Sequence, residues 1–324
     1  DHVDFYDIET TDEQINEQDK NNAQRAGHSE HVDSYENNDI LRGVLAELDE
    51  NGQPKEGGLV VEKVSLMPTY FKNDDQKKIF EGAKKNDVLT FNPSMAYEGS
   101  ETEVASLLKV KKEEVGAYSG DFSFQVDEIS RFVAAEVNQE LFDNVFGKDN
   151  VKSEEEFRGK IKENIEKQHV ADSDYKFLLD LRAYMEQKVG ELEFPTELLK
   201  KIMKANNKDK GEEFVEKNFD KSIEELKWHL IKEQLVEKNG IKVDDKELKE
   251  TAVQAARFQF AQYGMTDIPE EYLEQYATEM LKKREQVNAL VERCIDTKLV
   301  EAVKSVVTLD HKSISVEDFS KMFN

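Results

Sequence analysis

Apolar positions in the second half of the chain repeat with the spacing of a helix. Phe157, Ile161 and Ile165 lie four residues apart, and the apolar stripe continues to Val189. The stretch Ser153–Glu156 is a capping box, in which the first and fourth residues satisfy each other's backbone N–H groups at a helix start. The pattern predicts one helix of about 35 residues, or ~50 Å at 1.5 Å per residue.

Start and stop signals divide the rest of this half into helices joined by short loops. The first helix is predicted to stop at Phe194-Pro195, and capping boxes at Ser222 and Asp244 predict two further helix starts. Ile268–Glu271 predicts the start of a long helix that reaches Val306, and Ser315 is predicted to cap a short last helix. Nothing in this half supplies one central core. We therefore expect a helical body with arms rather than a globular bundle.

Residues 34–133 have a different pattern, in which short strands alternate with short helices. The segment Phe122–Ile129 alternates apolar and polar residues, as a half-buried strand does. Further strands are predicted near residues 40–45, 59–64 and 88–91, with a turn at Asp49–Gly52 and short helices at Gln76–Ala83 and Glu103–Leu108. This mixture predicts an antiparallel α+β domain.

The first 33 residues are acidic and carry a thin apolar stripe. Phe5–Ile8 is a candidate strand, and Thr11 with Gln14 predicts a helix that ends near Gly27. Such a helix needs a surface to pack against. The predicted division is therefore 1–33, a linker segment packing with the helical body; 34–133, the small α+β domain; and 134–324, the helical domain.

Composition and charge narrow the possible partners. Charged residues make up 35% of the chain, against about 25% in ordinary globular domains, which favours an open shape. The net charge of −25 should repel nucleic acid and anionic membranes, and it either attracts basic partners or only keeps the chain soluble. The single cysteine, Cys294, lies in an apolar helical pattern and is predicted to be a core residue.

No catalytic constellation is present in the sequence. The chain has no P-loop, no G-x-G-x-x-G and no G-x-S-x-G motif. His28 and His31 have a spacing that could bind a metal, but no third ligand follows them. We therefore predict no catalytic residue, no metal, no nucleotide and no other cofactor.

The most informative feature is a concentration of aromatic residues and methionine near residues 258–281, which Gly264 and Pro269 interrupt. These residues are either the core of a helical hairpin or an exposed apolar cradle that binds other polypeptides. The predicted binding residues are Phe258, Phe260, Tyr263, Met265, Tyr272 and Tyr276, with Phe177 and Met185 from a second apolar set.

Two stretches resemble one known family. ELFDNVFGKDN, with the capped helix and the GELEFPTELL step that follow it, and the last 80 residues, beginning FAQYGMTDIPEEYLEQY, are similar to bacterial trigger factor. Residues 1–33 resemble the linker helix of that family. The family's N-terminal ribosome-docking domain is expected to be missing from this chain, so ribosome binding is expected only through that missing domain.

The middle of the chain resembles the FK506-binding-protein-like (FKBP-like) prolyl isomerase domain of the family more loosely. Ile79–Asp87, Phe91–Pro93 and Tyr97 are similar to family segments, but the I-P-G entry before Ile79 is lacking. The resemblance implies a possible isomerase pocket at Phe80, Phe91, Tyr97 and Phe124, with weak or no activity because several pocket walls have no counterpart.

The predicted fold class is α+β, with a small FKBP-like antiparallel β domain attached to an extended all-α chaperone domain with helical arms. The resemblance implies an ATP-independent cytoplasmic chaperone that binds unfolded or nascent polypeptides. Three alternatives stay open: a peptidyl-prolyl isomerase whose helices present substrates, a periplasmic SurA-type chaperone, and a scaffold for one folded partner.

Overall fold

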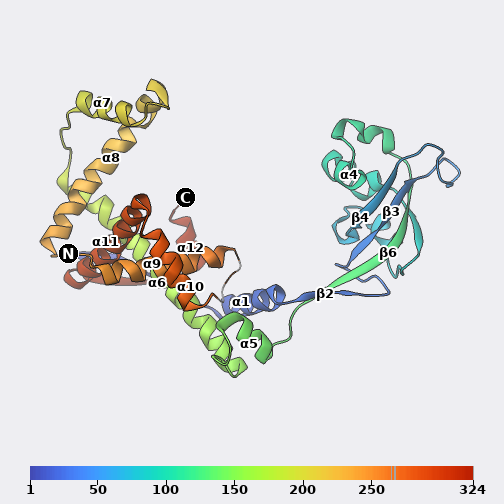
Figure 1. Cartoon of the computed structure of the whole chain (residues 1–324), viewed down its shortest axis with the longest axis horizontal. Coiled ribbons are helices and arrows are strands. Elements are labelled where there is room, and N and C mark those ends of the chain that lie inside the picture. The colour runs from blue at the N-terminus through green and yellow to red at the C-terminus, as the bar shows by residue number, and fades with distance from the viewer. Residues whose placement is uncertain (264, 266–267, 324) are drawn as a thin grey trace. The chain divides into compact units, whose positions relative to one another are not determined.

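The chain folds into two compact units in the computed structural model, which describes residues 1–263, 265 and 268–323. Lys20–Val137 form the sheet unit, and Asp1–Asp19 with Asn138–Asn324 form the helical unit (Figure 1). The predicted α+β class is confirmed. The segment limits predicted at residues 33 and 133 stay a prediction; along the chain, the division between the two units falls within α1 (Asp12–Arg25) and again after Val137.

The sheet unit is built on one antiparallel sheet, with strands in the order β2-β6-β3-β4 and β5 also paired with β6. Alternation places Leu41 and Leu45 of β3 and Phe124 and Val126 of β6 in the buried core. The strands are β2 (His28–His31), β3 (Ile40–Glu47), β4 (Val60–Leu66), β5 (Val88–Phe91) and β6 (Phe122–Val133). The helices are α2 (Asp74–Ile79), α3 (Pro93–Ala96) and α4 (Glu101–Leu108), with 3-10 turns at Pro68–Tyr70 and Lys112–Tyr118.

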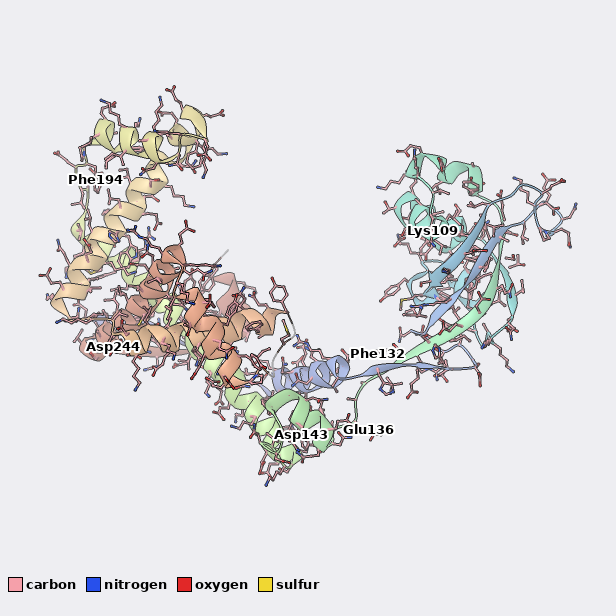
Figure 2. The ribbon with its side chains drawn as sticks, viewed as in Figure 1. Lys109, Phe132, Glu136, Asp143, Phe194 and Asp244 are labelled. Carbon is pink, nitrogen blue, oxygen red and sulfur yellow. The ribbon has the colours of Figure 1, made fainter. Side chains whose placement is uncertain are left out.

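The helical unit consists of helices and one small parallel sheet. Its strands, β1 (His2–Ile8) and β7 (Thr308–Ile314), pair the first segment of the chain with one near its end. Its helices are α5 (Gln139–Phe146), α6 (Glu154–Val189), α7 (Thr196–Asn206), α8 (Gly211–Lys238), α9 (Asp245–Gln262), α10 (Glu270–Met280), α11 (Arg284–Val306) and α12 (Val316–Lys321). Figure 2 shows Phe194 in the connection between α6 and α7, and Asp244 at the start of α9.

Three predicted helix starts are confirmed by their hydrogen bonds. The side chains of Ser153, Asp244 and Ser315 each accept a hydrogen bond from the backbone N–H three residues later, at 3.1, 2.7 and 3.1 Å. Each bond satisfies one of the N–H groups that a helix leaves without an internal partner. Polar side chains before an apolar stripe therefore located these three starts correctly.

Two predicted helix limits were wrong. Ser222 lies inside α8, which already begins at Gly211, because apolar residues before Ser222 continue the same helical stripe. The helix predicted from Ile268 to Val306 is broken between Met280 and Arg284 into α10 and α11. The break lets both helices pack against α9. Packing with neighbours decided both limits.

The core of the helical unit forms around Phe177, midway along α6. Phe177 is 2% exposed, and its ring centroid lies 6.1 Å from that of Phe5 in β1. Leu299, Val300 and Val303 of α11 complete this core. Cys294, also on α11, is buried as predicted. The core therefore joins the first strand, the longest helix and the second-last helix.

We expect Phe177→Ala to lower the free energy of unfolding of the helical unit by about 3–5 kcal/mol, because it leaves a cavity at the centre of this core. Trp228 on α8 is the only tryptophan, so its fluorescence in urea reports on this unit. The control, Tyr175→Ala, removes a ring that is 58% exposed on the same helix and should cost about 0.5 kcal/mol or less. Equal losses in the two variants would contradict this account of the core.

Candidate functional site

Part of the predicted binding set lies exposed at the turn between α9 and α10. Phe258, Tyr263, Met265 and Tyr272 are all exposed, and Tyr263 reaches 74%; we call these four residues the aromatic patch. Phe258 lies near the end of α9, and Tyr272 lies in the first turn of α10. The ion pair Arg257–Glu270, 2.7 Å long, ties the two helices together beside the patch. Gly264, predicted to interrupt this segment, lies outside the described residues.

Phe260 and Tyr276, from the same predicted set, face the other way. Their rings meet edge to face with centroids 5.0 Å apart, and both pack against the core of the α9–α10 pair. The Tyr276 hydroxyl donates a hydrogen bond to Oε1 of Gln259 at 3.2 Å. The sequence left two alternatives for residues 258–281, a hairpin core or an exposed apolar surface. Each is correct for part of the segment: Phe260 and Tyr276 belong to the hairpin core, and the aromatic patch is exposed.

Phe177 has to be withdrawn as a binding residue, because it is sealed in the core described above. Phe177 does lie on the predicted apolar stripe of α6, but Phe5 and α11 bury that part of the stripe. Met185, two turns further along α6, is only partly covered by that core, and it lines an open groove. Burial by β1, a strand contributed by the first residues of the chain, could not be read from the helical pattern.

The groove that contains Met185 runs between the C-terminal parts of α6 and α8 and has a volume of about 1120 Å³. We call it the α6–α8 groove. Val189 and Leu192 line it from the α6 side, and Leu230 lines it from α8; these three side chains are also exposed at about two-fifths of their surface. Ile231, Glu233, Gln234, Leu235, Glu237 and Lys238 complete its lining. Leu230 was missed from the sequence.

Ion pairs hold α8 in place on one side of this groove. The Lys232 ammonium group lies 2.6 Å from Glu292 and 2.5 Å from Asp296, both on α11. Although burial opposes its charge, the hydrogen bonds to these carboxylates raise the pKa of Lys232 above its ordinary value. Arg182 of α6 pairs with Glu225 of α8 at 3.0 Å. These contacts fix α8 beside α6 and α11, and the groove has a mixed lining of apolar and polar side chains.

The four residues predicted to form an isomerase pocket do not enclose an open cavity. Phe80, Phe91 and Phe124 are fully buried in the core of the sheet unit. The ring of Phe71 fills the space between them, with its centroid 5.6 Å from Phe80, 5.8 Å from Phe91 and 5.3 Å from Tyr97. The predicted pocket is thus corrected to a closed aromatic core.

The pKa of Tyr97 agrees with a closed aromatic core. Burial, with a smaller contribution from the charge of Glu103, raises the pKa of Tyr97 to about 12. A cavity of about 460 Å³ does open elsewhere on the sheet unit, and its lining includes Tyr35, Pro68, Thr69 and Lys77. None of the four predicted pocket residues lines that cavity.

The described part of the chain offers neither a metal site nor a membrane-spanning helix. No group of three or more His, Cys, Asp or Glu side chains there could hold a metal ion. His28 and His31 instead lie on β2 beside Glu30 and Glu128, at 2.9 and 2.7 Å. Over the same residues, no helix combines the length and apolar character needed to cross a bilayer.

Sequence models of two protein families match the two units. Residues 29–134 match "Probable trigger factor, FKBP-like domain", and residues 173–323 match "Probable trigger factor, C-terminal domain". Together the two matches cover most of the chain, in the order that the resemblance implied.

The chain belongs to the trigger factor family. Its sheet unit holds the FKBP-like domain, and its helical unit holds the trigger factor C-terminal domain. Both surfaces described above, the aromatic patch and the α6–α8 groove, therefore lie in the C-terminal domain of a trigger factor.

Other comparisons add little to this assignment. No curated protein matches the chain significantly. A solved structure, described as "Promiscuous Substrate Recognition in Folding and Assembly Activities of the Trigger Factor Chaperone", is similar at 17% identity with a TM-score of 0.42, covering 91% of this chain and 70% of that one. At that TM-score the two chains do not superpose closely, so the family assignment depends on the two domain models.

We expect Phe71→Ala to lower the pKa of Tyr97 from about 12 toward 10, because water would enter the space that the ring vacates. The neutral phenol stabilises the native state below pH 10, and this contribution is lost as the pH rises through the pKa that Tyr97 has in the folded protein. Nuclear magnetic resonance titration of ¹³C-labelled tyrosine measures the shift. Tyr70→Ala, an exposed neighbour, is the control; an unshifted Tyr97 in Phe71→Ala would refute the closed core.

This trigger factor chain should not measurably accelerate the cis–trans isomerisation of proline peptides. Lowering a barrier of ~18–20 kcal/mol requires a site that receives the proline ring, and Phe71 occupies the space between the predicted pocket residues. A protease-coupled assay checks this, with an active FK506-binding protein as positive control. Turnover close to that control would show that the aromatic core opens in solution.

Proposed function

We propose that this chain is an ATP-independent chaperone that holds apolar segments of unfolded or nascent polypeptides in the α6–α8 groove and on the aromatic patch. The observation that carries the proposal is that large apolar side chains line an open groove of about 1120 Å³ while others stand exposed at the α9–α10 turn. Contiguous apolar surface left exposed on a folded protein marks an interaction site. Membership of the trigger factor family supports a chaperone role.

Capture depends on burial of apolar surface and needs no nucleotide. Each client side chain that is fully removed from water contributes ~1.5–3 kcal/mol before ordering costs. Because the two surfaces belong to one unit, a client that occupies one meets the other at a raised effective concentration. A client leaves when it buries its own apolar segments by folding, so weak individual contacts favour release.

Acidic side chains accompany both surfaces and favour basic clients. Glu233 and Glu237 line the groove together with Lys238, and Glu271 and Glu274 are exposed on α10, the helix that carries Tyr272. The net charge of −25 keeps a complex soluble and disfavours nucleic acid and anionic membrane as partners. A cytoplasmic location is part of the proposal, supported by the family and by a free thiol at Cys294; ribosome contact would require the family's N-terminal domain.

Light scattering of a refolding client tests the proposal with two variants and one control. The groove variant is Leu192→Asp with Leu230→Asp, and the patch variant is Phe258→Ser with Tyr263→Ser and Tyr272→Ser. Each should weaken client binding about tenfold or more, since 1.4 kcal/mol corresponds to a factor of ten. All of these side chains are exposed, so Trp228 fluorescence in urea should change little.

The control variant, Val170→Ser with Val306→Ser, removes exposed apolar side chains outside both surfaces and should protect the client as wild type does. Several unrelated clients are used, because a scaffold for one folded partner would protect none of them. Full protection by a variant that combines the groove and patch changes would exclude both surfaces as the client site.

A further inference from the structure

Each of the two surfaces assigned to clients contains a methionine. Met265 belongs to the aromatic patch and is 45% exposed. Its backbone N–H donates to the carbonyl of Phe260 at 3.0 Å, which holds the residue against the end of α9. Met185 lies in the wall of the α6–α8 groove. A thioether sulfur is therefore part of each surface on which clients are proposed to lie.

Water and small neutral molecules reach both of these side chains. Met265 is exposed, and Met185 is partly buried in the wall of an open groove of about 1120 Å³, against ~30 Å³ for one water molecule in the liquid. Met280 on α10 is also partly buried, but it packs against the core of the α9–α10 pair. Met185 and Met265 are therefore more accessible to a small reagent than Met280 is.

Oxidation of the sulfur is the chemistry that separates methionine from other apolar residues. The sulfur takes an oxygen from hydrogen peroxide: an S–O bond forms, the O–O bond breaks, and the proton of the transferred oxygen leaves with the other oxygen as water. Sulfur loses the electron pair that peroxide gains, so no further reactant is needed. Because hydrogen peroxide is uncharged, the net charge of −25 does not repel it.

We propose that Met185 and Met265 are sites of reversible oxidation by hydrogen peroxide, and that their sulfoxides close both surfaces to clients. This regulation rests on the proposed function. In the free protein, the sulfoxide oxygen accepts hydrogen bonds from water. Beneath an apolar client segment the same oxygen loses its water and gains no donor, which opposes binding. Oxidation therefore destabilises the complex and not the free chain.

The positions of the two methionines allow the fold to survive oxidation. Met185 lies at the margin of the core around Phe177, which covers it only in part. Met265 lies between α9 and α10, outside both helices. A sulfoxide at Met280 would instead place a polar group against the α9–α10 core. Loss of client binding and loss of fold are therefore separable by position.

Peptide mass spectrometry after peroxide treatment of the whole chain maps the modified residues. Met185 and Met265 should each gain an oxygen before Met280 does. This measurement uses no client and is independent of the proposed function. Carboxymethylated lactalbumin, which stays unfolded, should slow both reactions when it is added in excess, because a bound client covers both sulfurs. Oxidation of Met280 as fast as Met185 and Met265 would overturn the proposal.

Light scattering of a refolding client then measures the regulation, with peroxide removed before the client is added. The resistant variant is Met185→Leu with Met265→Leu. The control, Met95→Leu with Met203→Leu and Met322→Leu, replaces methionines that lie outside both surfaces. Each protein is compared with itself before and after treatment. Wild type and the control should lose client affinity about tenfold or more, whereas the resistant variant should keep the affinity it had.

Reversal identifies the chemical change. Oxidised wild type should recover client protection with methionine sulfoxide reductase and dithiothreitol together, and not with dithiothreitol alone. Recovery with dithiothreitol alone would place the effect at the buried thiol of Cys294, and the proposal would be wrong. Trp228 fluorescence in urea should give the same unfolding midpoint before and after treatment, because the change lies on the surface.

Three results overturn the regulation: full protection by wild type that is oxidised at both positions, an equal loss in the resistant variant, or a lowered unfolding midpoint that explains the loss. If untreated wild type protects no client, the proposed function fails by itself. Binding of the apolar dye bis-ANS then replaces the client, and oxidation should weaken it in wild type but not in the resistant variant. Unchanged dye binding in oxidised wild type would also overturn the proposal.

Discussion

The contact between Phe5 and Phe177 holds the helical unit together. It fastens the first strand of the chain to the middle of α6, and β1 in turn pairs with β7, which follows α11. The hydroxyl of Ser173, one turn earlier on α6, donates to the backbone carbonyl of Tyr6 at 2.6 Å and fixes the same strand. One short core thus holds together segments from both ends of the sequence, and it covers only the middle of a 36-residue helix.

The uncovered C-terminal end of α6 follows from that restriction, whereas α5 buries Phe157 near its N-terminal end. A helix of 36 residues is about 54 Å long, so neighbours gathered around Phe177 cannot reach both of its ends. Toward the C-terminus the apolar stripe continues through Met185 to Val189 with only α8 beside it, and the α6–α8 groove opens there. Helix α7 lies further along the chain and packs against α8. Apolar surface on this unit is therefore a consequence of helix length.

The sequence predicted local structure well and burial poorly, for a physical reason. A cap such as Ser153 acts within four residues, so its pattern is visible in the chain. The parallel pairing of β1 with β7 joins residues about 300 positions apart and leaves no local signal. Phe177 and Phe258 are both aromatic residues in amphipathic helices, yet one is sealed by β1 and the other is exposed. Only the tertiary neighbours distinguish them.

Both units contain clusters of aromatic side chains, but the cluster in the sheet unit is buried and part of the cluster in the helical unit is exposed. In the sheet unit, Phe71 completes a ring of aromatic side chains, so every face of Phe91 finds a partner inside the chain. Between α9 and α10, Phe260 packs against Tyr276, but no ring or helix among the described residues covers Tyr263 or Tyr272. An aromatic side chain binds another molecule only where its own fold supplies no neighbour. This contrast supports the proposal that the helical unit binds clients, although the FKBP-like domain contains the denser aromatic cluster.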